Sequence, residues 1–187
     1  MPAALHYTDS AEANKLIAKD PMALLIGFVL DQQVTVQKAF TGPADLLARV
    51  GTLDAAKLAD ADLESVFREK PAIHRYPGVM ADRTRQLAEH IRDEYDGDAA
   101  KVWKSAKNAD ELKANLEALP GIGEMKVKSI SAVLAKRFKI KKAEPLVPWH
   151  PTLGDVDSPQ ALLEYQAAKR EHKKAWAKKK PPAGVAG

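Results

Sequence analysis

The most informative stretch of the chain is Asn115-Leu116-Glu117-Ala118-Leu119-Pro120-Gly121-Ile122-Gly123-Glu124-Met125-Lys126. It contains the end of one helix, a short turn and the start of a second helix, so it predicts a helical hairpin over about residues 109–138. Gly121 and Gly123 tolerate positive φ angles and let a ligand approach bare backbone. The first N–H groups of the second helix lack partners within it, and the helix dipole adds positive charge there. We therefore expect the hairpin to form a binding site for an anion such as a phosphate.

The side chains around the turn support this interpretation. Lys126 and Lys128 lie in the first turns of the second helix, where their charges add to the attraction for an anion. The alternative is an ordinary corner between two helices, in which glycine only ends the first helix. The turn residues followed by lysines favour phosphate binding over this alternative; the turn comprises Pro120, Gly121, Ile122 and Gly123.

Helical periodicity continues through nearly the whole chain. Helices are expected over residues 10–19, 21–30, 35–50, 53–59, 61–69, 80–95, 98–103 and 109–119, in the second half of the hairpin, and from 159 to about 178. No stretch has the two-residue alternation of a half-buried strand. The sequence predicts an all-α fold with a single domain over residues 1–180, followed by a disordered tail over 181–187.

Composition excludes several classes of protein. The chain has no cysteine, which excludes a disulfide framework, a thiolate zinc site and a cysteine nucleophile, and which fits a reducing cytoplasm. No apolar run approaches the ~18 residues of a membrane span, and the first residues lack the pattern of a signal peptide. We expect a cytoplasmic protein without a membrane partner.

The net charge of +4 is unevenly distributed along the chain. Residues 169–187 hold seven basic residues and one acidic residue, and residues 125–142 hold seven basic residues and no acidic one, so the remainder is negative. Clustered cations are typical of proteins that bind polyanions. The alternative is a solvated helix face together with a solubilising lysine-rich end.

Three segments together resemble the helix-hairpin-helix Gly/Pro/Asp superfamily of DNA glycosylases, and within it a small, cysteine-free bacterial subgroup. One segment is the hairpin. Another is residues 24–35, an apolar helix that ends in Gln-x-Thr, and the third is Pro77-Gly78 followed by a helix with Arg83 and Leu87. The resemblance covers about residues 20–174. It implies two helical lobes with a DNA-binding cleft between them, and a protein of base excision repair at the bacterial nucleoid.

The resemblance gives Gln33 and the hairpin their expected roles. Gln33 would enter the duplex as the damaged base is extruded, since a side chain that fills the gap offsets an unstacking cost of a few kcal/mol. The alternative is a polar residue that only bonds the carbonyls at a helix end. Bifunctional members carry a Schiff-base lysine where this chain has Met125, and Lys126 lies about 100° further around the helix. We therefore expect hydrolysis by water, without lyase activity.

The catalytic carboxylate of the family has three candidates in this sequence. The expected spacing after the hairpin leads to Glu144, whereas the similarity to a Val-Asp-Thr segment before a helix leads to Asp157, with Asp155 close by. The second assignment implies an insertion around residues 145–151. Asp157 is favoured because it precedes a helix start. The alternative is that Asp155 and Asp157 only cap that helix, in which case the protein binds DNA without cleaving glycosidic bonds.

Weaker candidates lie in two loops. His74, Trp149 and His150 could line a pocket for the extruded base, because such a base needs an aromatic face and a few hydrogen bonds. The alternatives are a loop histidine bonded to backbone for His74 and an ordered loop plug for Trp149 and His150. No metal-ligand spacing is present, so we expect no catalytic metal and no cofactor, although the family's hairpin often holds a monovalent cation on backbone carbonyls. The predicted function is that of a monomeric, monofunctional DNA glycosylase acting on lesion-containing duplex DNA. The alternatives are a catalytically silent, structure-specific DNA-binding protein and a helical protein-interaction module.

Overall fold

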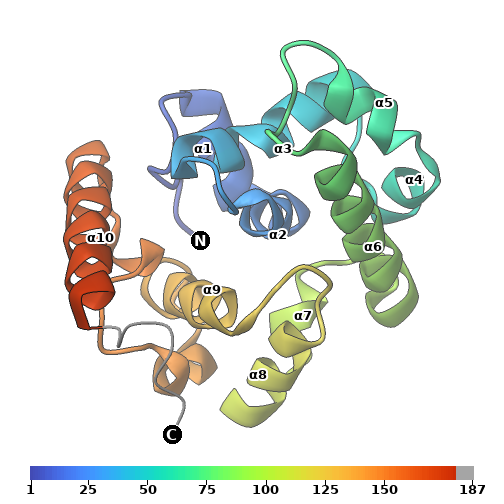
Figure 1. Cartoon of the computed structure of the whole chain (residues 1–187). Coiled ribbons are helices and arrows are strands. Elements are labelled where there is room, and N and C mark those ends of the chain that lie inside the picture. The colour runs from blue at the N-terminus through green and yellow to red at the C-terminus, as the bar shows by residue number, and fades with distance from the viewer. Residues whose placement is uncertain (180–187) are drawn as a thin grey trace, which may run out of the picture.

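The computed structural model describes residues 1–179, and within them the regular elements are all helical (Figure 1). These are α1 (Ala11–Lys19), α2 (Pro21–Leu30), α3 (Val36–Val50), α4 (Ala55–Asp60), α5 (Leu63–Arg68), α6 (Pro77–Tyr95), α7 (Lys101–Lys104), α8 (Ala109–Glu117), α9 (Glu124–Lys136), the 3-10 turns η1 (Lys141–Leu146) and η2 (Leu153–Asp155), and α10 (Pro159–Lys179). The all-α prediction is confirmed for this part of the chain. The tail predicted over residues 181–187 lies outside the described residues.

Side-chain caps set the helix starts that the sequence predicts. Asn108 Oδ1 accepts from the N–H of Glu111 at 2.9 Å and begins α8, and Ser158 Oγ accepts from the N–H of Ala161 at 3.1 Å and begins α10. Each bond satisfies one of the free N–H groups of a first turn, which stabilises a helix by roughly 1 kcal/mol.

The start of α6 corrects one expectation. The sequence predicts a helix from Met80, because Pro77-Gly78 reads as a break, but α6 begins at Pro77 with Tyr76 as its N-cap residue. Proline is compatible with the first helical position, where its missing N–H would have had no partner. The helix therefore extends three residues closer to the loop that holds His74.

The core is centred on α2, whose residues Met22–Leu30 are all buried. This helix packs against α1, α3 and α6. Gly27 lets α3 approach, since a Cβ there would collide with the Phe40 ring. The Phe40 ring also meets those of Phe28 and Tyr7 edge-on, with centroid separations of 5.1 Å in both pairs. The last turn of α2 is therefore closely packed, and it leads directly into the loop that carries the candidate site.

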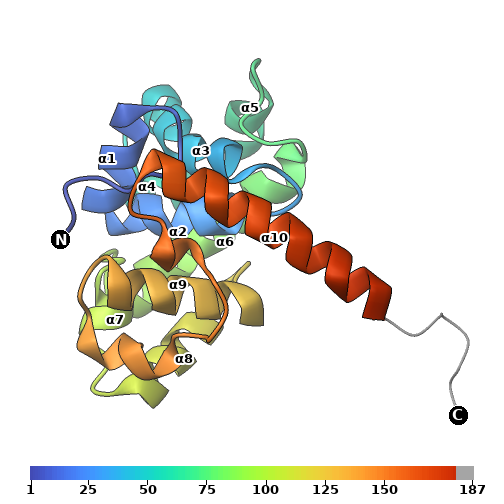
Figure 2. The same ribbon diagram turned by 90° about the vertical axis from the view of Figure 1, so that its left-hand side faces the viewer.

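The C-terminal part is built around α9, which packs against both η1 and η2. Gly154 lies against the backbone of Ala132, where a Cβ would come within 2.6 Å of the carbonyl group. The Tyr7 hydroxyl donates to the Leu153 carbonyl at 2.9 Å and joins the N-terminal segment to η2. In Figure 2, α10 runs across the face of the molecule that is turned toward the viewer, and its C-terminal half extends beyond the other helices. None of the described helices is both long and apolar enough to span a membrane.

Candidate nucleic-acid interface

The three segments that carry the family resemblance lie next to one another. Gly121, in the turn between α8 and α9, has a φ of 77°, and a Cβ built on it would lie 3.5 Å from the Val29 side chain and 3.8 Å from Arg83 Cδ. The turn therefore rests on the end of α2 and on the first half of α6. A left-handed φ at this point of closest approach explains the requirement for glycine.

The N-terminus of α9 is open to solvent. Gly123 is its N-cap residue, in extended conformation, and no side chain caps the helix. A Cβ on Gly123 would meet nothing within 4 Å, and Met125 is 65% exposed, whereas Ile122 is buried and anchors the turn. An open hollow of about 330 Å³ lies beside it, lined by Lys113, Glu117, Ile122, Gly123, Glu124, Val127 and Lys128. Free N–H groups at a helix start are a seat for an anionic group.

Three charged side chains lie at the N-terminus of α9 and affect its attraction for an anion. Lys128 Nζ lies 3.5 Å from Glu124 Oε1, and both side chains are well exposed, so the ion pair contributes little to stability. Lys128 can therefore leave Glu124 and bind a phosphate instead. Lys126 behaves differently, because its ammonium group donates to the Val29 carbonyl at 3.2 Å and to the Gly121 carbonyl at 3.3 Å. Burial lowers the pKa of Lys126 to about 8, against the opposing attraction of Asp31. Lys126 thus joins the turn to the end of α2.

The loop after α2 presents Gln33. This residue is exposed and has a φ of 56°, a left-handed conformation that is uncommon for side chains other than glycine, asparagine and aspartate. Its Oε1 accepts a hydrogen bond from the Tyr76 hydroxyl at 3.1 Å. The neighbouring Gln32 accepts from the Arg83 guanidinium through its Oε1. Both glutamines are therefore held by α6 or by the loop that leads into it.

His74 organises that loop from within. The ring is 1% exposed; its Nε2 lies 3.0 Å from the Leu30 carbonyl, and its Nδ1 accepts from the Tyr76 N–H at 2.9 Å. These contacts imply that Nε2 carries the proton. Burial lowers the pKa of His74, although its bonds to backbone groups oppose the shift. The ring nitrogens of His74 are thus engaged by backbone, and the residue positions Tyr76 rather than facing solvent.

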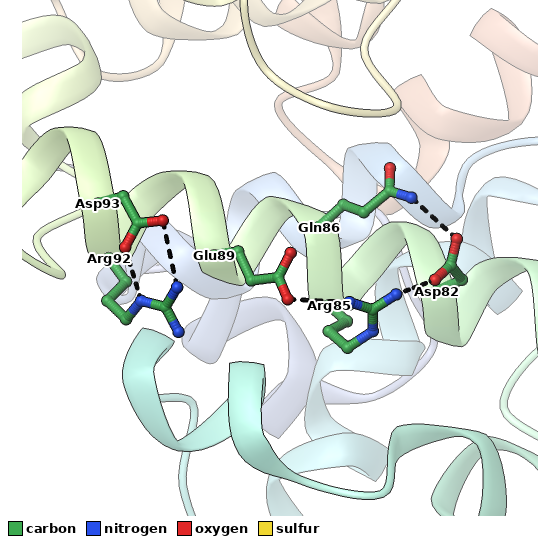
Figure 3. A network of polar contacts seen from close by, with 6 residues as sticks. All are labelled: Asp82, Arg85, Gln86, Glu89, Arg92 and Asp93. Carbon is green, nitrogen blue, oxygen red and sulfur yellow. Dashed lines mark hydrogen bonds and ion pairs between the residues drawn. The ribbon is translucent and has the colours of Figure 1, made fainter.

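Charged side chains along α6 pair with one another. Figure 3 shows Arg85 between Asp82 and Glu89, with Gln86 also on Asp82, and Arg92 paired with Asp93. These pairs occupy the guanidinium groups of Arg85 and Arg92. Arg83 instead turns toward Gln32 and the hairpin turn.

The three carboxylates proposed from sequence lie around η1 and η2. Asp155 closes a capping box with Thr152, whose N–H donates to Asp155 Oδ2 at 2.8 Å, and it pairs with Lys136. Burial raises the pKa of Asp155, but the bonds from Lys136 and Thr152 outweigh this effect and lower it. Asp157 and Glu144 are exposed, and α10 is capped by Ser158. Among the described residues, no hydrogen bond or ion pair joins these three carboxylates to the hairpin turn or to Gln33.

Trp149 and His150 lie in the loop between η1 and η2. Trp149 is 91% exposed, and its ring meets that of His150 edge-on at 5.7 Å. The His150 Nδ1 lies 3.2 Å from the neighbouring Pro151 carbonyl. The two rings form an exposed aromatic projection.

Asp31 is the feature of the site that sequence reasoning missed. It follows the last residue of α2, is half-buried, and lies near the charges of Lys126, Lys169 and Lys173. Burial raises the pKa of Asp31 while these lysines lower it, and the net direction is upward. The sequence signal was an acid directly after a wholly apolar helix, but the surrounding cations come from α9 and α10.

No group of three or more His, Asp or Glu side chains in the described part of the chain could hold a metal ion. Comparisons of the chain with protein-family models, curated proteins and solved structures find no match.

Proposed function

We propose that this protein is a monofunctional DNA glycosylase of base excision repair, with the α8–α9 turn as a helix-hairpin-helix motif. The observation that carries the proposal is the convergence of three segments that are distant in sequence. The turn at Gly121 rests on Val29 and Arg83, and Gln33 projects from the adjoining loop in a left-handed conformation. In this proposal α1–α6 form one lobe, the helices from α7 onward form the other, and DNA lies between them.

Each part of this surface has a role in the proposal. The open N-terminus of α9 binds a backbone phosphate, as helix N-termini do. Gln33 fills the space left by the extruded base, held ready by Tyr76. Met125 is exposed in the first turn of α9 and has no amine, so water attacks the sugar. The product is an abasic site in an intact strand.

The second candidate is a structure-specific DNA-binding protein without catalytic activity. The observation in its favour is the engagement of Asp155 in the η2 capping box and with Lys136, together with the exposure of Asp157 and Glu144. The family that the sequence resembles uses a catalytic carboxylate, and none of these three is bonded to the proposed DNA-binding surface within the described residues.

A panel of labelled duplexes containing uracil, alkylated bases or oxidised bases separates the two candidates. We expect abasic sites on at least one duplex, with strand breaks appearing only after alkali. Tight binding without abasic sites on every lesion would favour the binding protein. Borohydride trapping tests the hydrolytic route: a covalent adduct with DNA needs an amine nucleophile, and its loss in Lys126→Gln would assign that amine.

A further inference from the structure

A carboxylate stands unpaired beside the proposed DNA-binding surface. Asp31 lies between the end of α2 and Gln33, is half-buried, and makes no side-chain hydrogen bond or ion pair with any residue that the structure describes. Burial raises the pKa of Asp31, and the nearby lysines do not reverse this shift, in contrast to Asp155, whose hydrogen bonds lower its pKa. The residue as a whole is partly exposed, and its carboxylate has no partner among the described residues that a ligand would have to displace.

Three lysines from two other helices interact electrostatically with this carboxylate without forming an ion pair with it. Lys126 comes from α9, and Lys169 and Lys173 come from one face of α10, with a spacing of four residues. Tyr165 belongs to the same face, and burial raises its pKa to about 12, with the nearby Asp31 charge adding to the shift. α10 is held in this position by two amide hydrogen bonds between Gln37 and Gln166, at 3.1 and 2.8 Å.

Fold stability does not explain an acid at this point. The C-terminal end of a helix carries partial negative charge, so a carboxylate there is unfavourable. A half-buried carboxylate without hydrogen-bond partners is also unfavourable, because it loses hydration, and here the nearby lysines offset that loss only in part, since the net pKa shift is upward. Local features that lower stability are concentrated at functional sites. The backbone strain at Gln33, two residues away, is a second such feature.

We propose that Asp31 is the carboxylate that faces the sugar of the extruded nucleotide, an inference that rests on the proposed glycosylase function. The bond between C1′ and the base nitrogen breaks with its electron pair leaving on the base, which takes a proton from solvent. A water oxygen forms the new bond to C1′, and Asp31 accepts the proton of that water and later releases it to solvent. Before attack, its negative charge stabilises the developing sugar cation. Lys126, Lys169 and Lys173 hold the flanking phosphates.

The raised pKa of Asp31 agrees with this role, because a carboxylate whose pKa lies nearer to the working pH is a stronger base. The arrangement also separates tasks: cations bind the DNA backbone, and the unpaired acid remains free for the reacting sugar.

The test compares Asp31→Asn with Asp60→Asn in single-turnover assays on a duplex that the wild-type protein cleaves. Asp60 also ends a helix, α4, but is exposed, so the control removes the same charge from a similar backbone position. We expect Asp31→Asn to lower the rate at least 100-fold while duplex affinity is unchanged or higher, and Asp60→Asn to keep the wild-type rate. A rate for Asp31→Asn within threefold of wild type overturns the inference, as does a dead Asp157→Asn beside an active Asp31→Asn.

Two further measurements keep this test decisive. If Asp31→Asn does not fold, Asp31→Ser replaces it, and thermal unfolding establishes that the tested variant is native. The acidic limb of the wild-type pH–rate profile should disappear in the folded variant, and its persistence at full rate contradicts the role. A wild-type protein inactive on every lesion overturns the proposed function itself, whereas an active wild type with an active Asp31 variant overturns only the role of Asp31.

Discussion

At the residue scale, the site is built from three consecutive side chains after α2, of which, within the part of the chain that the structure describes, the two glutamines are held by hydrogen bonds and the aspartate is not. Asp31 lies among lysines of α9 and α10, Gln32 bonds Arg83 of α6, and Gln33 bonds Tyr76. The function expected of Gln33 came from the family resemblance of residues 24–35. The one sequence signal for Asp31, an acid directly after an apolar helix, is too common to single the residue out until α9 and α10 are placed beside it.

Lys126 gives a prediction at this scale. Its pKa is lowered to about 8 by burial, with Asp31 raising it and Arg83 lowering it further. If its ammonium group contributes to DNA binding, affinity should fall by up to about tenfold between pH 7 and pH 9 as the group loses its proton. Lys126→Arg should remove most of this dependence, because arginine stays charged throughout. Fluorescence anisotropy with a labelled duplex measures both, and an equal decline in the two proteins would exclude Lys126 as its source.

Asp31 gives a second prediction, on stability. Because its pKa is raised in the folded state, its ionised form destabilises the fold at neutral pH, and this effect vanishes as the pH falls toward the unfolded pKa near 4. Asp31→Asn should therefore have a higher Tm than wild type at pH 7.5, and the difference should narrow toward pH 4. Asp60→Asn, exposed at the end of α4, should match wild type throughout. A lower Tm for Asp31→Asn at neutral pH would mean that the lysines outweigh burial.

At the element scale, the sequence predicted most helices because their signals are local. Caps such as Asn108 and Ser158 lie next to the helices they begin, and the apolar spacing of each helix spans only a few turns. The turns η1 and η2 were not predicted. Their conformation depends on contacts with α9, such as that between Gly154 and the backbone of Ala132, which no local pattern reveals.

Two glycines of the α8–α9 turn allow a prediction that separates fold stability from DNA binding. Gly121→Ala places a side chain at a φ of 77° and should destabilise the fold by about 1–2 kcal/mol. Gly123→Asp supplies a favourable N-cap for α9 and should keep or raise stability, yet its charge should weaken DNA binding at least tenfold by repelling the phosphate. Denaturant titration and anisotropy measure the two effects.

A matched control for backbone strain is available in α3. Gly51 ends that helix with a φ of 85° and has open space around it. Gly51→Ala should lose stability comparably to Gly121→Ala without a change in DNA affinity at temperatures where the fold persists. Unchanged DNA binding by Gly123→Asp would show that the start of α9 is not the phosphate seat.

At the scale of the whole molecule, the fold redistributes the charge that the sequence concentrates in two segments. The basic residues between 125 and 142 are spread along α9, which is roughly 20 Å long at 1.5 Å per residue, so they form two groups at opposite ends of the helix. Lys126 lies at the end near the candidate site, whereas Lys136 pairs with Asp155 and Lys142 bonds backbone carbonyls at the other end. Part of α10, in contrast, joins the site. Charge counts along the sequence indicated a polyanion partner but could not show which cations act together.

Two faces of α10 allow a last prediction that separates local from general electrostatics. Lys169 and Lys173 lie near Asp31, whereas Arg170 and Lys174 belong to another face, with Lys174 Nζ 3.7 Å from Glu171 Oε1. The double variants Lys169→Gln/Lys173→Gln and Arg170→Gln/Lys174→Gln lose the same net charge. If the first face contacts phosphates, only the first variant should reduce the slope of log affinity against log salt concentration by about two units, since each lost contact contributes ~0.9. Equal reductions in both variants would mean that α10 attracts DNA only through its net charge, and that the face toward Asp31 makes no defined phosphate contacts.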